Sequence, residues 1–199
     1  MHALNAQVHW DAGGQVGVMQ RIATGAGPGG ASPEPGPVAE LHAHLAILPM
    51  LRVGPYLSHD IAPLAGGRPS RQVTEAGLRA KLSPPILSAP WQTWGFLGVG
   101  YARAYEPSHT FAFPEPAELA VPGGSVVPGQ GGGLLEARVG LGLGYRLGRD
   151  WEPFLELGGR VGLLFAGSLY ERGACGCGEP YAGKDSFALS LSLGLSLNQ

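Results

Sequence analysis

The sequence predicts an all-β protein, an eight-stranded antiparallel up-and-down transmembrane β-barrel that forms a single domain over residues 1–199. Long stretches alternate between apolar and small or polar residues, as "SFALSLSLGLSLNQ" does near the C-terminus, and successive side chains of a strand point to opposite faces. The polar positions mix both signs of charge with glycine, which weakens a solvated strand. We therefore expect the polar face to pack inside a narrow, closed barrel.

Four predicted strands lie in the first half of the chain. The first is "QVHWDAGGQVGVMQRIAT", and the fourth is "RQVTEAGLRAKL". The second and third share "VAELHAHLAILPMLRVGPYLSHDI", which we divide at Pro49 because proline has no N–H to donate to a ladder. Their expected ranges are 7–24, 38–47, 51–61 and 71–82.

Four more predicted strands follow in the second half. They are "TWGFLGVGYARAY", "LLEARVGLGLGYRL", "EPFLELGGRVGLLFAGSL" and the closing stretch. Their apolar residues recur at every second position, and no longer segment has a convincing helical period. Their expected ranges are 93–105, 134–147, 152–169 and 185–198.

The odd-numbered connections are longer than the even-numbered ones, with 62–70 against 83–92 as the exception. The long loops are expected at about 25–37, 62–70, 107–133 and 170–184, and the tight turns at about 48–50, 83–92 and 148–151. In a meander, the odd-numbered links all lie at one end. Long loops at one end and tight turns at the other are typical of outer-membrane barrels. Both termini would then lie at the tight-turn end, which would be periplasmic.

The charged residues of the polar face are nearly matched in sign. Buried charges persist where they are paired and hydrogen-bonded, so we predict a lumen closed by ion pairs rather than an open pore. The predicted network consists of Glu40, Arg52, Glu75, Arg79, Glu136, Arg138, Glu156 and Arg160.

Composition restricts the functional classes. Charged residues are 14% of the chain, below the roughly 25% of soluble domains. No apolar stretch reaches the length of a transmembrane helix. A formal net charge of −2, with no basic run, gives no sign of nucleic-acid binding. The opening "MHALNAQVHWD" lacks the basic and apolar regions of a signal peptide, so none is visible in this numbering.

Aromatic residues lie mostly near the ends of the predicted strands. Girdles at two bilayer interfaces would have this distribution, but aromatic residues also favour strands in general. The sequence leaves both interpretations open. The residues concerned are Trp10, Trp91, Trp94, Tyr101, Tyr105, Tyr145, Trp151, Phe165, Tyr170 and Phe187.

In this pattern the chain resembles the small eight-stranded outer-membrane barrels, the OmpA-like and OmpX-like group. The last strand also resembles their C-terminal assembly signal at Ser192, Gly194 and Leu197, although Gln199 stands where the aromatic residue usually is. The resemblance implies a Gram-negative outer-membrane location, contact with membrane lipid, help from the barrel assembly machinery, and a monomer. It also implies a non-enzymatic role, in envelope integrity or in surface binding through the loops.

Two cysteines and two histidines are candidates for a disulfide or for metal binding. Cys175 and Cys177 favour a small loop disulfide, with free thiols and then a metal site as alternatives. "ELHAH" places Glu40, His42 and His44 on one strand face, where they can bind a metal or join the lumen network. The residues that follow do not fit a cupin, and we expect no metal site and no cofactor.

Two alternative functions remain. One is a soluble, lipocalin-like barrel with leucines lining a calyx and charges in water. The other is a small lipid-A-modifying enzyme using Ser108 and His109, although the sequence has no spacing typical of a catalytic triad. We expect no catalytic residues.

Overall fold

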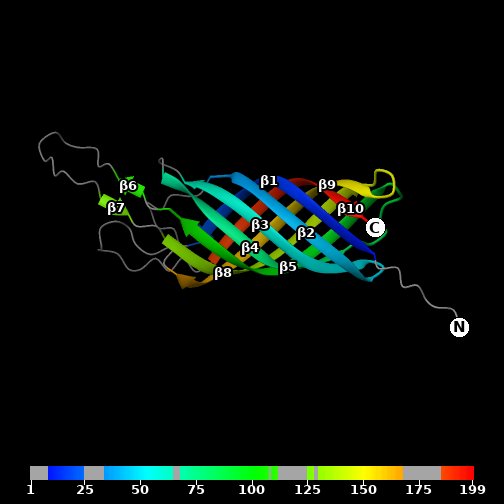
Figure 1. Cartoon of the computed structure of the whole chain (residues 1–199), viewed down its shortest axis with the longest axis horizontal. Helices are drawn as coiled ribbons and strands as arrows, with labels where there is room; N and C mark the ends of the chain where they lie inside the picture. The colour runs from blue at the N-terminus through cyan, green and yellow to red at the C-terminus, as the bar shows by residue number, and fades with distance from the viewer. Residues whose placement is uncertain are drawn as a thin grey trace, which may run out of the picture.

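A computed structural model describes residues 9–24, 34–64, 68–107, 109–111, 125–127, 130–167 and 185–199. Eight antiparallel strands form a closed barrel in the order β1-β10-β9-β8-β5-β4-β3-β2, and β6 and β7 form a separate two-stranded sheet (Figure 1). The strands are β1 (Trp10–Thr24), β2 (Gly36–Leu48), β3 (Leu51–Leu64), β4 (Arg68–Leu82), β5 (Trp91–Glu106), β6 (His109–Phe111), β7 (Ser125–Val127), β8 (Gln130–Tyr145), β9 (Trp151–Gly167) and β10 (Asp185–Asn198).

The all-β prediction and the eight-stranded barrel are confirmed. The described residues contain no helix of the length and hydropathy needed to span a membrane.

Several strands run further than the sequence predicts. The expected loop at 62–70 is shorter, because β3 continues to Leu64 and β4 already begins at Arg68. The register between these strands shifts between Ala62 and Leu64. This irregularity leaves Pro63, which has no N–H, out of the regular ladder. The expected loop at 107–133 likewise contains β6, β7 and the start of β8.

The chain reverses tightly at one end of the barrel. Pro49 and Met50 form the turn between β2 and β3, and residues 146–150 connect β8 to β9. In that second turn Gly148 has a φ of 68°, which favours glycine. Figure 1 places the C-terminus at this end and β6 and β7 beyond the other. We call these the turn end and the loop end.

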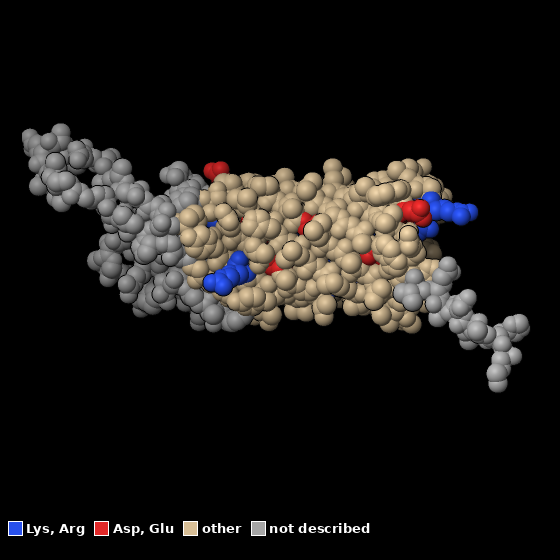
Figure 2. Space-filling model, in the orientation of Figure 1, with Lys and Arg blue, Asp and Glu red and all other residues tan. Residues whose placement is uncertain are grey.

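The two faces of the barrel wall differ as the alternation predicts. In β2, buried and exposed residues alternate strictly from Gly36 to Leu45. In β10, Leu189, Leu191 and Leu193 are exposed, whereas Ser186, Ser192 and Ser196 are buried. In Figure 2 the visible side of the barrel is almost uncharged, and the charged atoms that protrude lie toward its ends. Apolar side chains therefore form the outside of the barrel.

Bulky side chains occupy the lumen next to glycines. Trp94, which the sequence grouped with possible girdle residues, is only 2% exposed and lies inside, where it packs with Phe96 and Phe154. Its even position in β5 places it on the inner face, although it is near the strand end. Glycine at position 142 leaves space for the indole, because a Cβ there would overlap the ring of Trp94.

Replacing Gly142 by alanine is expected to lower the free energy of unfolding by about 1–3 kcal/mol, as overpacking does in a filled core. Trp94 has little freedom to move, since it contacts Phe154 edge-on and donates a hydrogen bond to Glu156. Urea unfolding of the folded protein, followed by tryptophan fluorescence, measures the change.

Gly95→Ala is the matched control on the neighbouring strand. A Cβ at Gly95 meets its nearest atom, Leu141 Cδ2, at 3.8 Å, so the change should stay within about 0.5 kcal/mol. Equal effects of the two substitutions would contradict a role for glycine in accommodating the indole.

Candidate functional site

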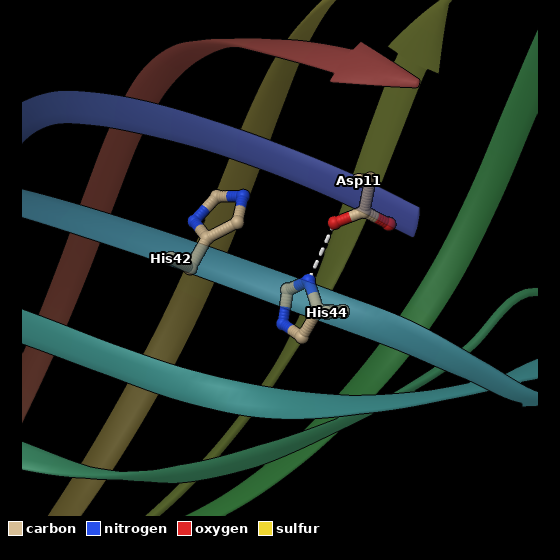
Figure 3. A group of neighbouring side chains, drawn as sticks. All are labelled: Asp11, His42 and His44. Atoms are coloured by element: carbon tan, nitrogen blue, oxygen red, sulfur yellow. Dashed lines mark hydrogen bonds and ion pairs between the residues drawn. The ribbon is translucent and has the colours of Figure 1, made fainter. Parts of the chain in front are cut away.

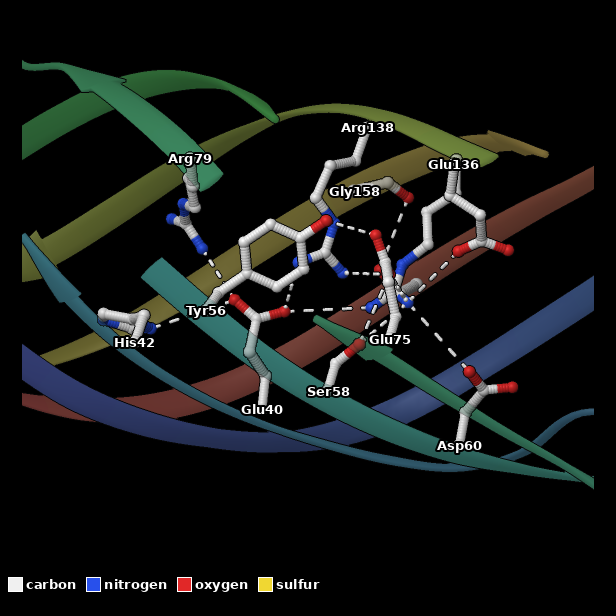
Figure 4. A network of polar contacts seen from close by, with 12 residues as sticks. Glu40, His42, Tyr56, Ser58, Asp60, Glu75, Arg79, Glu136, Arg138 and Gly158 are labelled. Carbon is white, nitrogen blue, oxygen red and sulfur yellow. Dashed lines mark hydrogen bonds and ion pairs between the residues drawn. The ribbon is translucent and has the colours of Figure 1, made fainter. Parts of the chain in front are cut away.

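The lumen contains a network of buried charged side chains, contributed by six of the eight barrel strands. The two-residue period of each strand places these residues on the inner face. The members are Arg21 of β1, Glu40 of β2, Asp60 of β3, Glu75 and Arg79 of β4, Glu136 and Arg138 of β8, and Glu156 and Arg160 of β9. We call this set the lumen network, and Figure 4 shows part of it, with Glu40, Glu75 and Arg138 among the labelled residues.

Glu40 lies at the centre of the lumen network. Its Oε1 accepts a hydrogen bond from Arg79 Nη1 at 2.9 Å, and its Oε2 accepts one from Arg138 Nη1 at 2.8 Å. Arg160 Nη2 lies 3.7 Å from the same Oε2. A single carboxylate thus binds guanidinium groups from β4, β8 and β9, and it connects β2 to these three strands.

Arg79 extends the network toward the aromatic residues. Its guanidinium contacts Glu156, and its Cζ lies 4.0 Å from the centre of the Phe96 ring. Glu156 also accepts a hydrogen bond from Trp94 Nε1 at 2.9 Å. Charge pairing, hydrogen bonding and a cation–π contact therefore all stabilise the buried Arg79.

Glu75 forms a second centre. Its Oε2 accepts a hydrogen bond from Arg160 Nη1 at 2.7 Å and lies 3.4 Å from Arg138 Nη2. The hydroxyl of Tyr56 donates to its other oxygen. Because Arg138 and Arg160 also contact Glu40, the two centres belong to one connected network.

Arg21 and Asp60, which are not among the predicted network residues, extend the network toward the loop end. Arg21 forms a two-pronged pair with Asp60, from Nε to Oδ2 at 2.7 Å and from Nη2 to Oδ1 at 2.8 Å. Its Nη1 donates to Glu136 Oε1 at 2.6 Å. Both residues could have been predicted, because each lies an even number of positions from inward-facing residues of its own strand.

The sequence predicts that Arg52 pairs with a glutamate of the network, but it pairs with an aspartate outside it. Its Nη1 donates to Asp11 Oδ2 at 2.5 Å and to Asn198 Oδ1 at 3.0 Å, near the turn end. Lys81 Nζ also lies 3.8 Å from Asp11 Oδ2. Arg52 is close to the start of β3, so its level along the barrel axis matches the start of β1 rather than the central glutamates.

The structure thus brings seven of the eight predicted network residues into one connected cluster and places Arg52 in a neighbouring one. Ser108, Cys175 and Cys177 lie outside the described residues. His109 begins β6, but only its backbone is described.

Side chains fill much of the middle of the lumen. A cavity of about 10 Å³ is lined by Gln15, Glu40, Arg138, Glu156 and Arg160, among others. This is about the space that one water molecule requires. The arrangement is the inverse of a lipocalin-like calyx, because the leucines lie outside and the charges inside. The described barrel therefore contradicts the soluble, lipocalin-like alternative.

The fold is that of small outer-membrane barrels. Neisserial surface protein A has a similar structure, with a TM-score of 0.57 and 13% sequence identity, over 95% of this chain and 96% of that one. A major outer membrane protein from Thermus thermophilus is similar with a TM-score of 0.50 and 16% identity, over 100% of both chains. No protein-family model matches the sequence. No curated protein matches it either.

Proposed function

We propose that this chain is a non-enzymatic protein of the Gram-negative outer membrane whose lumen is closed by the lumen network. Its role would then lie outside the lumen, in envelope integrity or in binding through the long loops. The observation that carries the proposal is the division of the wall into an apolar outer face and a charged inner face, which suits a barrel surrounded by lipid. The shared fold of the outer-membrane barrels supports the location.

The arrangement of the charges supports a closed lumen. Arg79 and Arg138 reach Glu40 from strands that are not its neighbours in the barrel, so the ion pairs cross the interior. A solute that crosses the lumen would have to separate buried ion pairs, which leaves buried charges without their partners. We propose that the barrel works as a monomer, after insertion by the barrel assembly machinery.

The membrane assignment predicts a requirement for detergent or lipid. The refolded chain should stay dispersed only in detergent micelles or vesicles, and its gel mobility should differ between unheated and boiled samples. A monodisperse folded monomer in plain buffer would overturn the proposal.

The closed lumen predicts little conductance in a planar bilayer. The wild-type protein should show no stable single-channel steps, whereas Arg138→Glu should conduct, because a third carboxylate beside Glu40 and Glu75 repels both. Arg149→Glu, at an exposed turn position, is the control for a change of charge alone. Steady conductance by the wild type would refute the closed lumen and leave the membrane location standing.

A further inference from the structure

A cluster of two histidines and one aspartate lies in the lumen near the turn end, beside the lumen network. Asp11 is the register partner of His44 across β1 and β2, and His42 lies two residues before His44 on the same inner face. One nitrogen or oxygen atom from each side chain lies within 4.8 Å of those of the other two. Figure 3 shows the three side chains on these adjacent strands.

The cluster is buried and incompletely hydrogen-bonded. The side chains of Asp11 and His44 are 0% exposed, and that of His42 is 2% exposed. His44 Nδ1 lies 2.6 Å from Asp11 Oδ1. His44 Nε2 and His42 Nδ1 are buried without a hydrogen-bond partner among the described residues. His42 Nδ1 lies 3.9 Å from Glu40 Oε1, on the side of the lumen network. The contact between His44 Nδ1 and Asp11 Oδ1 is therefore the one hydrogen bond that the described residues form within the cluster.

A glycine on the adjacent strand allows the His42 side chain to lie close to β1. Gly13 is the register partner of His42, and a Cβ at that position would come within 2.9 Å of His42 Nε2. Glycine at this position therefore lets the His42 imidazole approach the backbone of β1, the strand that carries Asp11. In contrast, Glu40, which the sequence groups with the two histidines, is already occupied by Arg79 and Arg138.

We propose that Asp11, His42 and His44 bind a divalent transition-metal cation of the Zn²⁺ class, with one coordination position left to water. Two imidazoles and a carboxylate are ligands that such cations prefer. The three donor atoms lie within 4.8 Å of one another, and an ion among them would form bonds of about 2.0–2.2 Å. His44 Nδ1 then exchanges its contact with Asp11 for the metal, and its ring proton resides on Nε2.

Two neighbouring cations determine how tightly the site binds. Arg52 Nη1 and Lys81 Nζ lie 2.5 Å and 3.8 Å from Asp11 Oδ2, whereas the oxygen near His44 is Oδ1. The carboxylate thus directs one oxygen to the cations and the other to the histidines. Repulsion from Lys81 weakens metal binding, so removing that charge should strengthen it.

The test uses the full chain, folded in detergent and freed of metal by a chelator. Zn²⁺ and Co²⁺ are titrated separately, by calorimetry and by the visible absorption of Co²⁺. We expect one ion per chain. His42→Gln and His44→Gln should each lower the affinity at least about tenfold, since even ligand-supporting residues have effects of that size. Lys81→Met should raise the affinity, because it removes a repelling charge.

His59→Gln is the matched control, since His59 is an exposed histidine on the outer face of β3 and should leave binding unchanged. Gel mobility without heating verifies that each variant is folded. The proposal is overturned if no ion binds, if binding survives His44→Gln, or if Lys81→Met weakens it. None of these outcomes bears on the proposed function, which the detergent requirement and the conductance of metal-free protein test separately.

Discussion

Replacing Glu40 by glutamine is expected to lower the free energy of unfolding by about 3–5 kcal/mol, the cost of removing one partner of a buried ion pair. The substitution keeps the shape of the side chain and removes its charge. Arg79 and Arg138, both almost fully buried, then lose a carboxylate that each binds at less than 3 Å. Urea unfolding in lipid vesicles, followed by tryptophan fluorescence, measures the loss.

Asp150→Asn is the control for this experiment. Asp150 lies at an exposed position in the turn between β8 and β9, and removing its charge should change stability by less than about 0.5 kcal/mol. If Glu40→Gln is as mild as Asp150→Asn, the lumen network does not stabilise the fold, and the other ion pairs compensate for its central carboxylate.

Replacing Leu191 by arginine is expected to destabilise the folded barrel in vesicles by about 2–4 kcal/mol, as a cation at the midplane of a bilayer does. Leu191 lies in the middle of β10, is 53% exposed, and is flanked across the ladders by Val18 and Leu157. This loss of stability requires lipid at this face, because an arginine exposed to water would change the free energy of unfolding little.

The matched control for lipid contact is Leu147→Arg. Leu147 is 52% exposed, but it lies in the turn next to Arg146 at the turn end of the barrel. There the cost should fall to about 0–1 kcal/mol, as it does near the bilayer interface. Similar losses at both positions would contradict a lipid-facing belt with β10 crossing its centre.

The strand period explains why the inward face was predictable from the sequence. Alternation alone places Glu40, Glu75, Glu136 and Glu156 on the inner face, and each is buried. It does not determine the level of a residue along the barrel axis, which depends on the stagger of the closed sheet. For that reason the sequence could not distinguish Arg52, beside Asp11, from the arginines that reach Glu40.

Two other differences have local causes. β6 and β7 are three residues each, too short for an alternation to stand out within a glycine- and proline-rich connection. Trp94 lies near the start of β5, where girdle aromatics are expected, and its inward direction depends on parity rather than on its place along the strand. The sequence could not show that Asp11 lies beside His44, because this contact depends on the register between β1 and β2.

The last strand has a consequence for the order of assembly. From Ser186 to Asn198, the inner face of β10 carries only serine, alanine, glycine and asparagine. The ion pairs of the lumen network connect β1, β2, β3, β4, β8 and β9, and among the described residues none of them involves β10. Closing the ladder between β1 and β10 therefore requires no ion pair of the lumen network to be made or broken by a β10 side chain.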